Sequence, residues 1–401
     1  MTATSSTTGL RDTPESKPSW RRKHRWRLVP FFLLILLVIA ATIAGLVWKG
    51  QQSPLGEGVI EPTAEPGEPL DAACTPDFAE PAADPWGPES AAESEAVWQS
   101  HAEEIGGYWF EGDDGQVLLG EANWSNLSQA VGRTRLSPEH VEAWDGYLSN
   151  MRADLAERGL DLYVVVAPAK WQIVPEALPD WMEQLRGPGH FAQLQEELPG
   201  LPWVDVRPAM AEAAETTPVY APLNSHWTDY GAAVAFGQVA ACMRASDPAL
   251  ASMPDLPVDG AEFVADRNEF AGVGLPREPG LDWTVPVWSQ EPPAMTIVGP
   301  DGVEQEADAT ASLLMGQLPA TTRTPSAPVD QHVLLVRDST GDQLAPMFQT
   351  MFRQTTQIRS SLETPSGMPD VAAEADAVGA DAVVLVMTQR YLEIVPGVER
   401  E

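Results

Sequence analysis

The chain has little cysteine and little positive charge, and both shortages exclude certain classes of protein and of binding partner. Its two cysteines in 401 residues are too few for a disulfide framework. Lys and Arg number 24 against 58 Asp and Glu, which gives a formal net charge of −34. A nucleic-acid-binding surface needs clustered Lys and Arg, so this charge argues against that partner. No His-x-x-x-His or Cys-x-x-Cys arrangement occurs, and we expect neither a metal nor a cofactor.

The N-terminal 48 residues combine a basic cluster with a long uncharged run. Residues 1–27 carry seven basic and two acidic side chains, and the 21 residues of 28–48 carry no charge. A run of this length is sufficient for a helix to cross a bilayer. Because positive flanks stay in the cytoplasm, we predict a cytoplasmic tail over 1–27, a transmembrane helix over 28–48 and an extracytoplasmic remainder. A cleaved signal peptide is the alternative, although its apolar region is typically only about 7–15 residues long.

The remainder divides by composition. Residues 49–95 are rich in Pro, Glu and Ala, which predicts an extended acidic stalk, and residues 96–401 would form the ectodomain. Within it, residues 250–330 are Pro-rich, and we predict an insertion of irregular and β structure that walls a substrate groove. An extracytoplasmic location permits a disulfide, for which Cys74 and Cys242 are the only possible pair; two unpaired buried thiols are the alternative.

Buried strands alternate with helices through the ectodomain. The runs "LDLYVVV", "LPWVDV", "HVLLV" and "DAVVLV" lack alternation, which is typical of strands covered on both faces. Helices separate them; one, over 137–159, has Ser137 as N-cap, Pro138 at its first position and Gly159 as stop. "YWFEGDDGQVLLGE" predicts a hairpin that turns at Asp114-Gly115. We therefore expect an α/β fold with a mainly parallel sheet and helices on both faces.

Polar residues follow these strands, at the edge where parallel sheets carry their active sites. Ser339 follows "VLLV", where its hydroxyl would be exposed in a tight turn and its own N–H could stabilise an oxyanion. A serine nucleophile needs a base, and His226 in "NSHWTDYGA" is the credible candidate. The second imidazole nitrogen then needs a hydrogen-bond acceptor.

Each of these residues also has a structural interpretation. An Asp-Ser pair after a strand often caps a helix, and His226 could serve only as a hydrogen-bonding residue. Trp227 could be core, and Lys170 and Arg207 could be surface or cap residues. The candidate catalytic residues are Ser339, His226, Asn224 and Asp338, and the candidate substrate-binding residues are Lys170, Arg207, Trp227 and Arg337.

Five blocks in this order resemble the AlgX/AlgJ family of SGNH hydrolase-like proteins, which act in alginate O-acetylation. They are "YWFEGDDGQVLLGE", "VVVAPAKWQIVPEALP", "VYAPLNSHWTDYGA", "VLLVRDSTGDQLAPMF" and "DAVVLVMTQRYL". The resemblance implies an SGNH-like fold and O-acetyl transfer to an extracytoplasmic polysaccharide, with a membrane-bound acyltransferase supplying the acetyl group. It also implies that Ser339 is the nucleophile, that His226 is the base and that position 224 holds the orienting acid.

The chain departs from the family pattern at three positions within these blocks. The family aspartate is Asn224, which cannot offset the charge of an imidazolium, and the glycine and phenylalanine of its serine block are Arg337 and Thr340. Another carboxylate could replace the missing acid, or the pair could work as a slower dyad. Alternative functions are an inactive carbohydrate-binding or scaffolding protein, which 14 Trp would suit, and an adhesion or stalk protein. The candidates for the replacement carboxylate are Asp205, Asp229 and Asp342.

Overall fold

The computed structural model describes residues 58–398, apart from residues 66 and 266. The predicted cytoplasmic tail and the predicted transmembrane helix over 28–48 lie outside this part of the chain. Among the residues that are described, no helix combines the length and the apolar character needed to cross a bilayer.

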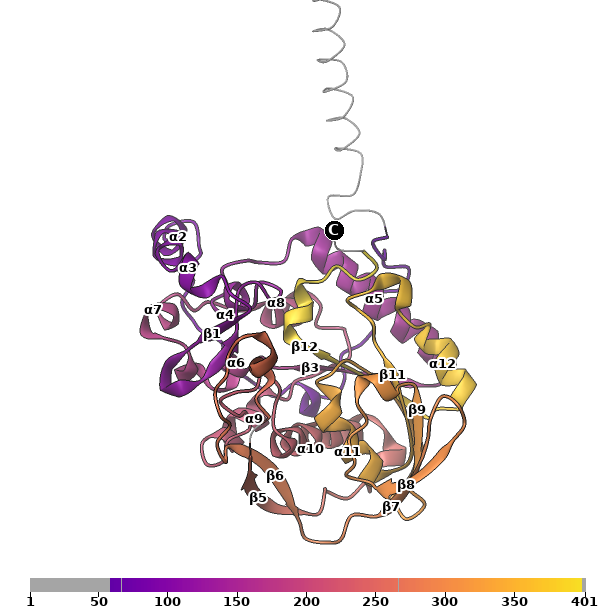
Figure 1. Ribbon diagram of the computed structural model, residues 1–401. Helices are drawn as coiled ribbons and strands as arrows, with labels where there is room; N and C mark the ends of the chain where they lie inside the picture. Colours follow the sequence, from indigo (N-terminus) through magenta and orange to yellow (C-terminus); the bar gives the residue numbers. More distant parts are fainter. Residues whose placement is uncertain (1–57, 66, 266, 399–401) are drawn as a thin grey trace, which may run out of the picture. The chain divides into compact units, whose positions relative to one another are not determined.

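An eight-stranded sheet forms the centre of the described domain (Figure 1). Its strands run in the order β4-β3-β12-β10-β11-β9-β7-β8, and the first five are parallel. The α/β class is confirmed, but the sheet is mixed, because three antiparallel strands extend it. The strands are β3 (Asp161–Ala167), β4 (Trp203–Val204), β7 (Ala294–Val298), β8 (Glu304–Asp308), β9 (Ala320–Arg323), β10 (Val329–Arg337), β11 (Phe352–Arg359) and β12 (Ala382–Thr388).

Helices cover both faces of the sheet, as the unbroken apolar strands predict. Along β10, Val333 and Leu335 enter one hydrophobic core and Leu334 and Val336 enter the other. The first core lies under α9, α10 and α11, and the second under α5, α8 and α12. The helices are α2 (Ala91–Ser100), α3 (Ala102–Ile105), α4 (Asn126–Ala130), α5 (Pro138–Ala156), α6 (Lys170–Ile173), α7 (Asp180–Glu183), α8 (His190–Glu197), α9 (Arg207–Ala214), α10 (Asp229–Ser246), α11 (Gly341–Met351) and α12 (Val371–Val378).

Local sequence signals correctly predicted two further elements, the helix α5 and the first hairpin. Ser137 caps α5 by accepting the backbone N–H of His140, and Gly159, three residues after the end of the helix at Ala156, turns the chain with a φ of +73°. β1 (Trp109–Glu111) and β2 (Val117–Leu119) form the predicted hairpin. Its turn passes through Asp114 and Gly115, whose φ values are +53° and +73°.

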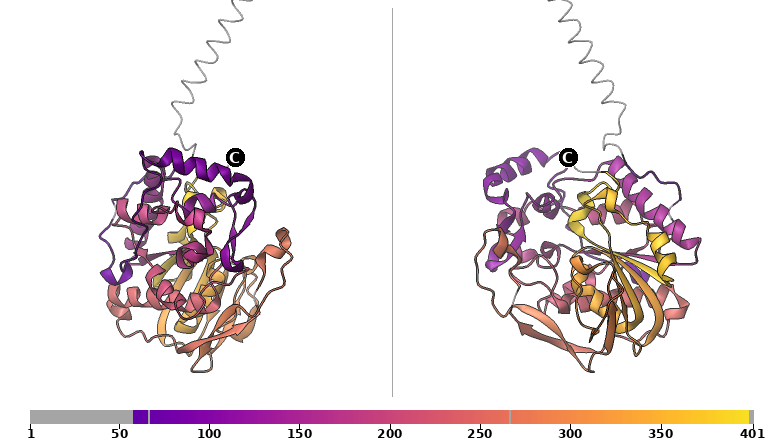
Figure 2. Two further views of the ribbon diagram at one scale, coloured as in Figure 1. Left: turned by 90° about the vertical axis from the view of Figure 1, so that its left-hand side faces the viewer. Right: turned by 45° about the vertical axis from the view of Figure 1, so that its right-hand side comes forward.

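The insertion over 250–330 contributes β structure in two places. β5 (Val258–Val264) pairs with β6 (Trp283–Trp288) as a separate antiparallel ribbon. β7, β8 and β9 instead join the antiparallel side of the central sheet through β11. Figure 2 shows these salmon-to-orange strands along one edge of the domain. Between β5 and β6 lies the 3-10 helix η5 (Glu269–Val273).

The described part of the predicted acidic stalk packs against the domain. From Gly58 onwards the chain lies against the domain: Thr63 bonds to Asn150, and Gly146 has no Cβ because one would lie 2.1 Å from the Ile60 carbonyl oxygen. Cys74 forms a disulfide with Cys242 of α10. Composition alone could not reveal these contacts, because each partner is more than 80 residues away in the chain.

Candidate active site

Ser339 occupies the loop between β10 and α11, and Asp338 fixes that loop. The Asp338 side chain, which is 4% exposed, accepts the Thr340 N–H at 2.8 Å and the Thr340 hydroxyl at 2.5 Å through Oδ1. Its Oδ2 accepts the N–H of Thr388, the last residue of β12, at 2.7 Å. Asp338 therefore positions the serine loop against the neighbouring strand, which corrects the prediction that it takes part in the chemistry.

His226 precedes α10, and its imidazole faces the serine. The loop is held by Trp227, which pairs with Tyr220 in an isolated bridge, and by Thr228, whose hydroxyl caps α10 by accepting the Gly231 N–H at 2.9 Å. The imidazole Nε2 lies 3.0 Å from the Ser339 Oγ, although the two residues are 113 positions apart in the chain. The structure thus brings together the predicted nucleophile and base within hydrogen-bond reach.

Glu269, which the sequence did not single out, occupies the other side of this imidazole. Its Oε2 lies 2.9 Å from the His226 Nδ1, and its Oε1 accepts the Ser225 hydroxyl at 2.6 Å. Burial alone would raise the pKa of Glu269, but the hydrogen bond and charge of His226, together with the Ser225 hydrogen bonds, lower it to about 2. The carboxylate is therefore ionised at neutral pH.

Asn224 also contacts the histidine, as an acceptor without charge. Its Oδ1 lies 3.2 Å from Nδ1 and accepts the His226 backbone N–H at 3.0 Å. Its Nδ2 donates to the Arg267 carbonyl oxygen at 2.8 Å, which fixes the orientation of the amide. The amide oxygen therefore faces the histidine.

The three aspartates considered as replacement acids are engaged elsewhere. Asp205 binds Arg207, and Asp229 accepts the Trp283 Nε1–H at 2.9 Å. Asp342 binds Arg337 at 2.6 Å. None of them makes a hydrogen bond to His226 among the contacts of the described residues, so these predictions were wrong.

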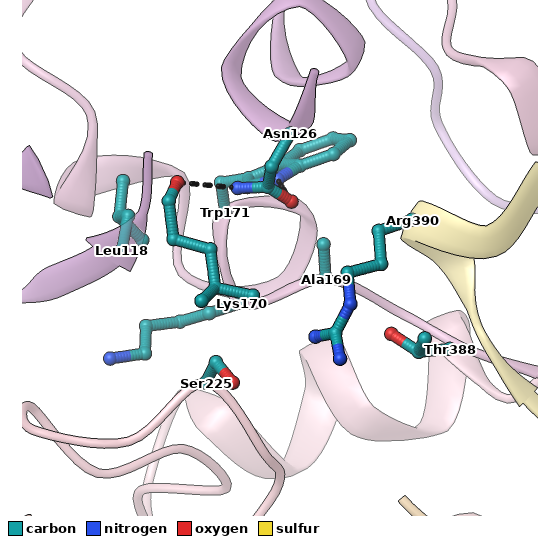
Figure 3. A pocket seen from close by; sticks show the side chains of 9 residues that line it. Leu118, Asn126, Ala169, Lys170, Trp171, Ser225, Thr388 and Arg390 are labelled. Carbon is teal, nitrogen blue, oxygen red and sulfur yellow. Dashed lines mark hydrogen bonds between the residues drawn. The ribbon is translucent and has the colours of Figure 1, made fainter. Parts of the chain in front are cut away.

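Two of the predicted substrate-binding residues are buried cations with structural contacts. The Lys170 Nζ donates to the carbonyl oxygens of Val117, Ala221 and Pro222 at 2.8, 2.7 and 3.0 Å, and in Figure 3 it points away from Arg390. Arg207 is 2% exposed and binds Asp205, Glu80 and Gln195. Lys170 is among the residues that line a small cavity, but its ammonium and the Arg207 guanidinium are both engaged by these contacts, so the predicted substrate contact is corrected for both.

The other two predicted substrate-binding residues, Trp227 and Arg337, support the loop that carries Ser339. Trp227 is 1% exposed, and its Nε1–H donates to the Thr340 carbonyl oxygen at 2.9 Å, so it is not a platform for a sugar. Arg337 has no exposed surface, and its Nη1 donates to Asp342 and to the Asp338 carbonyl oxygen beneath the serine loop. Arg337 therefore neither crowds the serine nor meets a substrate.

The serine has an open oxyanion side. The Ser339 backbone N–H has no hydrogen-bond partner among residues 58–398 as described. Ser339 also lines a cavity of about 260 Å³ over the ends of β10 and β11, with Met315, Glu363 and Tyr391 among its other lining residues. This free donor beside a cavity is where the oxygen of an acyl group can bind.

A second, smaller cavity lies over the ends of β3 and β12 and is the one in Figure 3. Its volume is about 20 Å³, and Ser225, Thr388 and Arg390 are among the residues that line it. The Arg390 Nε is buried and has no hydrogen-bond partner in the described part of the chain. The described residues contain no group of three His, Cys, Asp or Glu side chains that could hold a metal ion.

Comparison with known proteins supports the family resemblance. Residues 117–269 match the family model described as "SGNH hydrolase-like domain, acetyltransferase AlgX". The match begins at β2 and ends at Glu269, so it includes Asn224 and His226, whereas Ser339 lies beyond it. The resemblance to the AlgX family that the sequence blocks indicated is thereby confirmed. No curated protein matches the chain.

Several solved structures match the chain at low identity, with TM-scores below 0.5. PatB1 of Bacillus cereus with a sulfonyl adduct has 11% identity and a TM-score of 0.47, with 71% of this chain and 95% of that chain covered. A DHHW family protein of Eubacterium siraeum has 14% identity and a TM-score of 0.43, covering 61% and 84%. The O-acetyltransferase domain of Pseudomonas putida AlgJ has 13% identity and a TM-score of 0.38, covering 71% and 92%.

Proposed function

We propose that the protein is an acyl-transfer enzyme that moves acetyl groups onto or off hydroxyl groups of a cell-envelope polysaccharide, through a covalent intermediate on Ser339. The observation that carries the proposal is the 3.0 Å separation of the His226 Nε2 and the Ser339 Oγ at the edge of a cavity. A serine hydroxyl needs an adjacent base to become a nucleophile, and this geometry provides one. The family match, which includes the histidine, supports acyl transfer in particular.

The first half of the reaction forms the acyl-enzyme. His226 takes the Ser339 proton as the Oγ attacks the acetyl carbonyl carbon, and the resulting oxyanion accepts the Ser339 N–H. When the tetrahedral intermediate collapses, the bond to the donor oxygen breaks and His226 returns the proton to that oxygen. Acetyl remains on Ser339 as an ester.

The second half regenerates the serine. A sugar hydroxyl enters, His226 takes its proton, and the sugar oxygen attacks the acetyl carbon. Collapse then breaks the bond to the Ser339 Oγ, which recovers its proton from His226. A water molecule in place of the sugar hydroxyl would make the same site an acetylesterase.

The cellular setting belongs to the proposal. The basic residues 1–27 followed by the uncharged run 28–48 support a single-pass anchor with a cytoplasmic N-terminus and an extracytoplasmic catalytic domain. An acetyl donor outside the cytoplasm would then come from a membrane-bound acyltransferase partner. The negative charge of the chain is consistent with a saccharide partner and opposes nucleic acid.

An inactive carbohydrate-binding protein is the weaker alternative. Its appeal was the tryptophan content, but Trp144, Trp203, Trp227 and Trp283 are at most 2% exposed and cannot stack on a sugar. The contacts of His226 with Ser339 on one side and with the Glu269 carboxylate on the other match the arrangement of a nucleophile, base and acid.

Hydrolysis of p-nitrophenyl acetate by the full chain in a mild detergent tests the proposal. Ser339→Ala should lower kcat/KM by at least about a thousandfold, because nucleophile and base act as a unit. Ser361→Ala is the matched control, since this serine lines the same cavity but makes no hydrogen bond to His226 among the described contacts. Equal rates in wild type and Ser339→Ala would refute the proposed enzyme activity.

A further inference from the structure

His226 needs a negative partner if it is to hold a proton during acyl transfer. An imidazolium forms at each step in which the histidine accepts a proton, and a neutral amide cannot offset its charge. The residue two positions before the histidine, Asn224, is such an amide, and its Nδ2 is committed to the Arg267 carbonyl oxygen. Position 224 therefore supplies an acceptor and no charge.

Glu269 supplies that charge from the insertion. Its backbone N–H donates to the Leu223 carbonyl oxygen at 3.2 Å, which ties the start of η5 to the histidine loop. Ser225 holds one carboxylate oxygen at 2.6 Å and leaves the other 2.9 Å from the His226 Nδ1. Both oxygens are thus fixed, and the carboxylate cannot turn away from the imidazole without breaking the hydrogen bond to Ser225.

We propose that Glu269 is the positioning acid of this site, and that the insertion has taken over the role that position 224 no longer fills. The inference rests on the proposed function, because it concerns the same histidine. Glu269 fixes the tautomer in which Nδ1 carries the proton and Nε2 faces Ser339, and it stabilises the imidazolium. Asn224 then ties the histidine loop to the insertion by donating to the Arg267 carbonyl oxygen, and it supports the loop itself by accepting the His226 backbone N–H.

Two substitutions, one of a carboxylate by an amide and one of an amide by a carboxylate, test the assignment in the hydrolysis of p-nitrophenyl acetate by the full chain. Glu269→Gln keeps the size and loses the charge; the same type of change in a serine-protease triad costs about 10⁴ in kcat, and we expect at least about a hundredfold here, with KM nearly unchanged. Asn224→Asp alone should not raise kcat, because it places a second negative charge beside Glu269 and removes the donor to the Arg267 carbonyl oxygen.

The double variant Asn224→Asp/Glu269→Gln moves the acid back to position 224. It should recover at least about tenfold in kcat over Glu269→Gln, since one carboxylate again faces Nδ1. Asp229→Asn is the matched control: this carboxylate lies three residues after the histidine and bonds to Trp283, so its loss should leave kcat nearly unchanged.

The outcomes separate this inference from the proposed function. Loss of activity in Ser339→Ala together with a nearly unchanged kcat in Glu269→Gln would overturn the role of Glu269 and leave the enzyme activity standing. A faster reaction in Asn224→Asp than in wild type would also overturn it, because it would show that the charge is missing. A double variant no faster than Glu269→Gln would count against the transfer of the role from position 224. Activity unaffected by Ser339→Ala would remove the proposed function itself.

Discussion

The fit between Arg337 and Gly341 yields a prediction that can be worked out in numbers. Arg337 is fully buried one residue before Asp338, and its guanidinium binds Gln357, Asp342 and the Leu313 carbonyl oxygen. A Cβ on Gly341 would lie 2.2 Å from the Arg337 Cδ, 2.8 Å from its Cβ and 3.0 Å from its Cγ. The arginine cannot yield, because its far end is fixed by these hydrogen bonds.

Gly341→Ala should therefore destabilise the protein by about 3 kcal/mol. Overpacking a buried site costs about 1–3 kcal/mol, and weakening a hydrogen bond to a charged group adds about 1.5–3 kcal/mol, while alanine regains up to about 1 kcal/mol over glycine in a helix. The assay is urea unfolding at 25 °C. Gly237→Ala in α10 is the control, because nothing lies within 4 Å of its added Cβ and it should be neutral or stabilising.

A double-mutant cycle shows whether Arg337 is the cause. In an Arg337→Gly background the clash is gone, so Gly341→Ala should be neutral or slightly stabilising there, and the coupling energy should exceed about 2 kcal/mol. A Gly341→Ala protein as stable as wild type, or one equally destabilised in both backgrounds, would refute this reasoning. Activity should fall in parallel with stability, since Ser339 lies between the two residues.

Three further predictions concern stability and the serine loop. Replacing Cys74 and Cys242 by serine opens a loop of 168 residues and should lower the unfolding free energy by up to about 5 kcal/mol in urea; an unchanged midpoint would contradict it. Burial lowers the pKa of His190 from 6.5 to about 4. The contribution of this neutral histidine to stability should therefore be complete above pH 6.5, and the unfolding free energy should fall by up to about 3 kcal/mol as the pH falls to 4. In His190→Gln, Tm should decrease less over the same pH range. Trp227→Phe leaves the buried Thr340 carbonyl oxygen without its donor, so it should lower the unfolding free energy by about 1–3 kcal/mol and also lower kcat. Full activity and stability would contradict the role of this indole.

The elements that the sequence predicted were those with strong local signals. β3, β10 and β12 each contain a continuous apolar run, and α5 begins at Pro138 with Ser137 as its N-cap. β11 was missed because its sequence "FRQTTQIR" is polar; inside the sheet, Gln357 and Thr356 are satisfied by Arg337 and by Thr321 and His332. Its antiparallel neighbours could not be ordered from the sequence, because register is set by tertiary pairing.

The site was predicted in part for the same reason. Ser339 and His226 follow recognisable blocks, whereas Glu269 lies 43 residues after the histidine in a Pro-rich segment without a motif. Lys170 could not be recognised as buried, because the carbonyl oxygens that it binds lie 51 to 53 residues away. The neighbouring Asp205 could be seen beside Arg207, but Glu80, which lies 127 residues away, could not. A charge that follows a strand looks the same in a sequence whether it meets a ligand or a distant part of the chain.

Covalent labelling of Ser339 tests the central claim most directly. A phosphonylating probe directed at activated serines, followed by peptide mapping with mass spectrometry, should place the adduct on Ser339 in the wild-type chain. Labelling should slow by at least about a hundredfold in His226→Ala, because the hydroxyl loses its base. An adduct that forms on Ser339 equally fast without His226, or no adduct on Ser339 in the folded wild-type protein, would contradict the account.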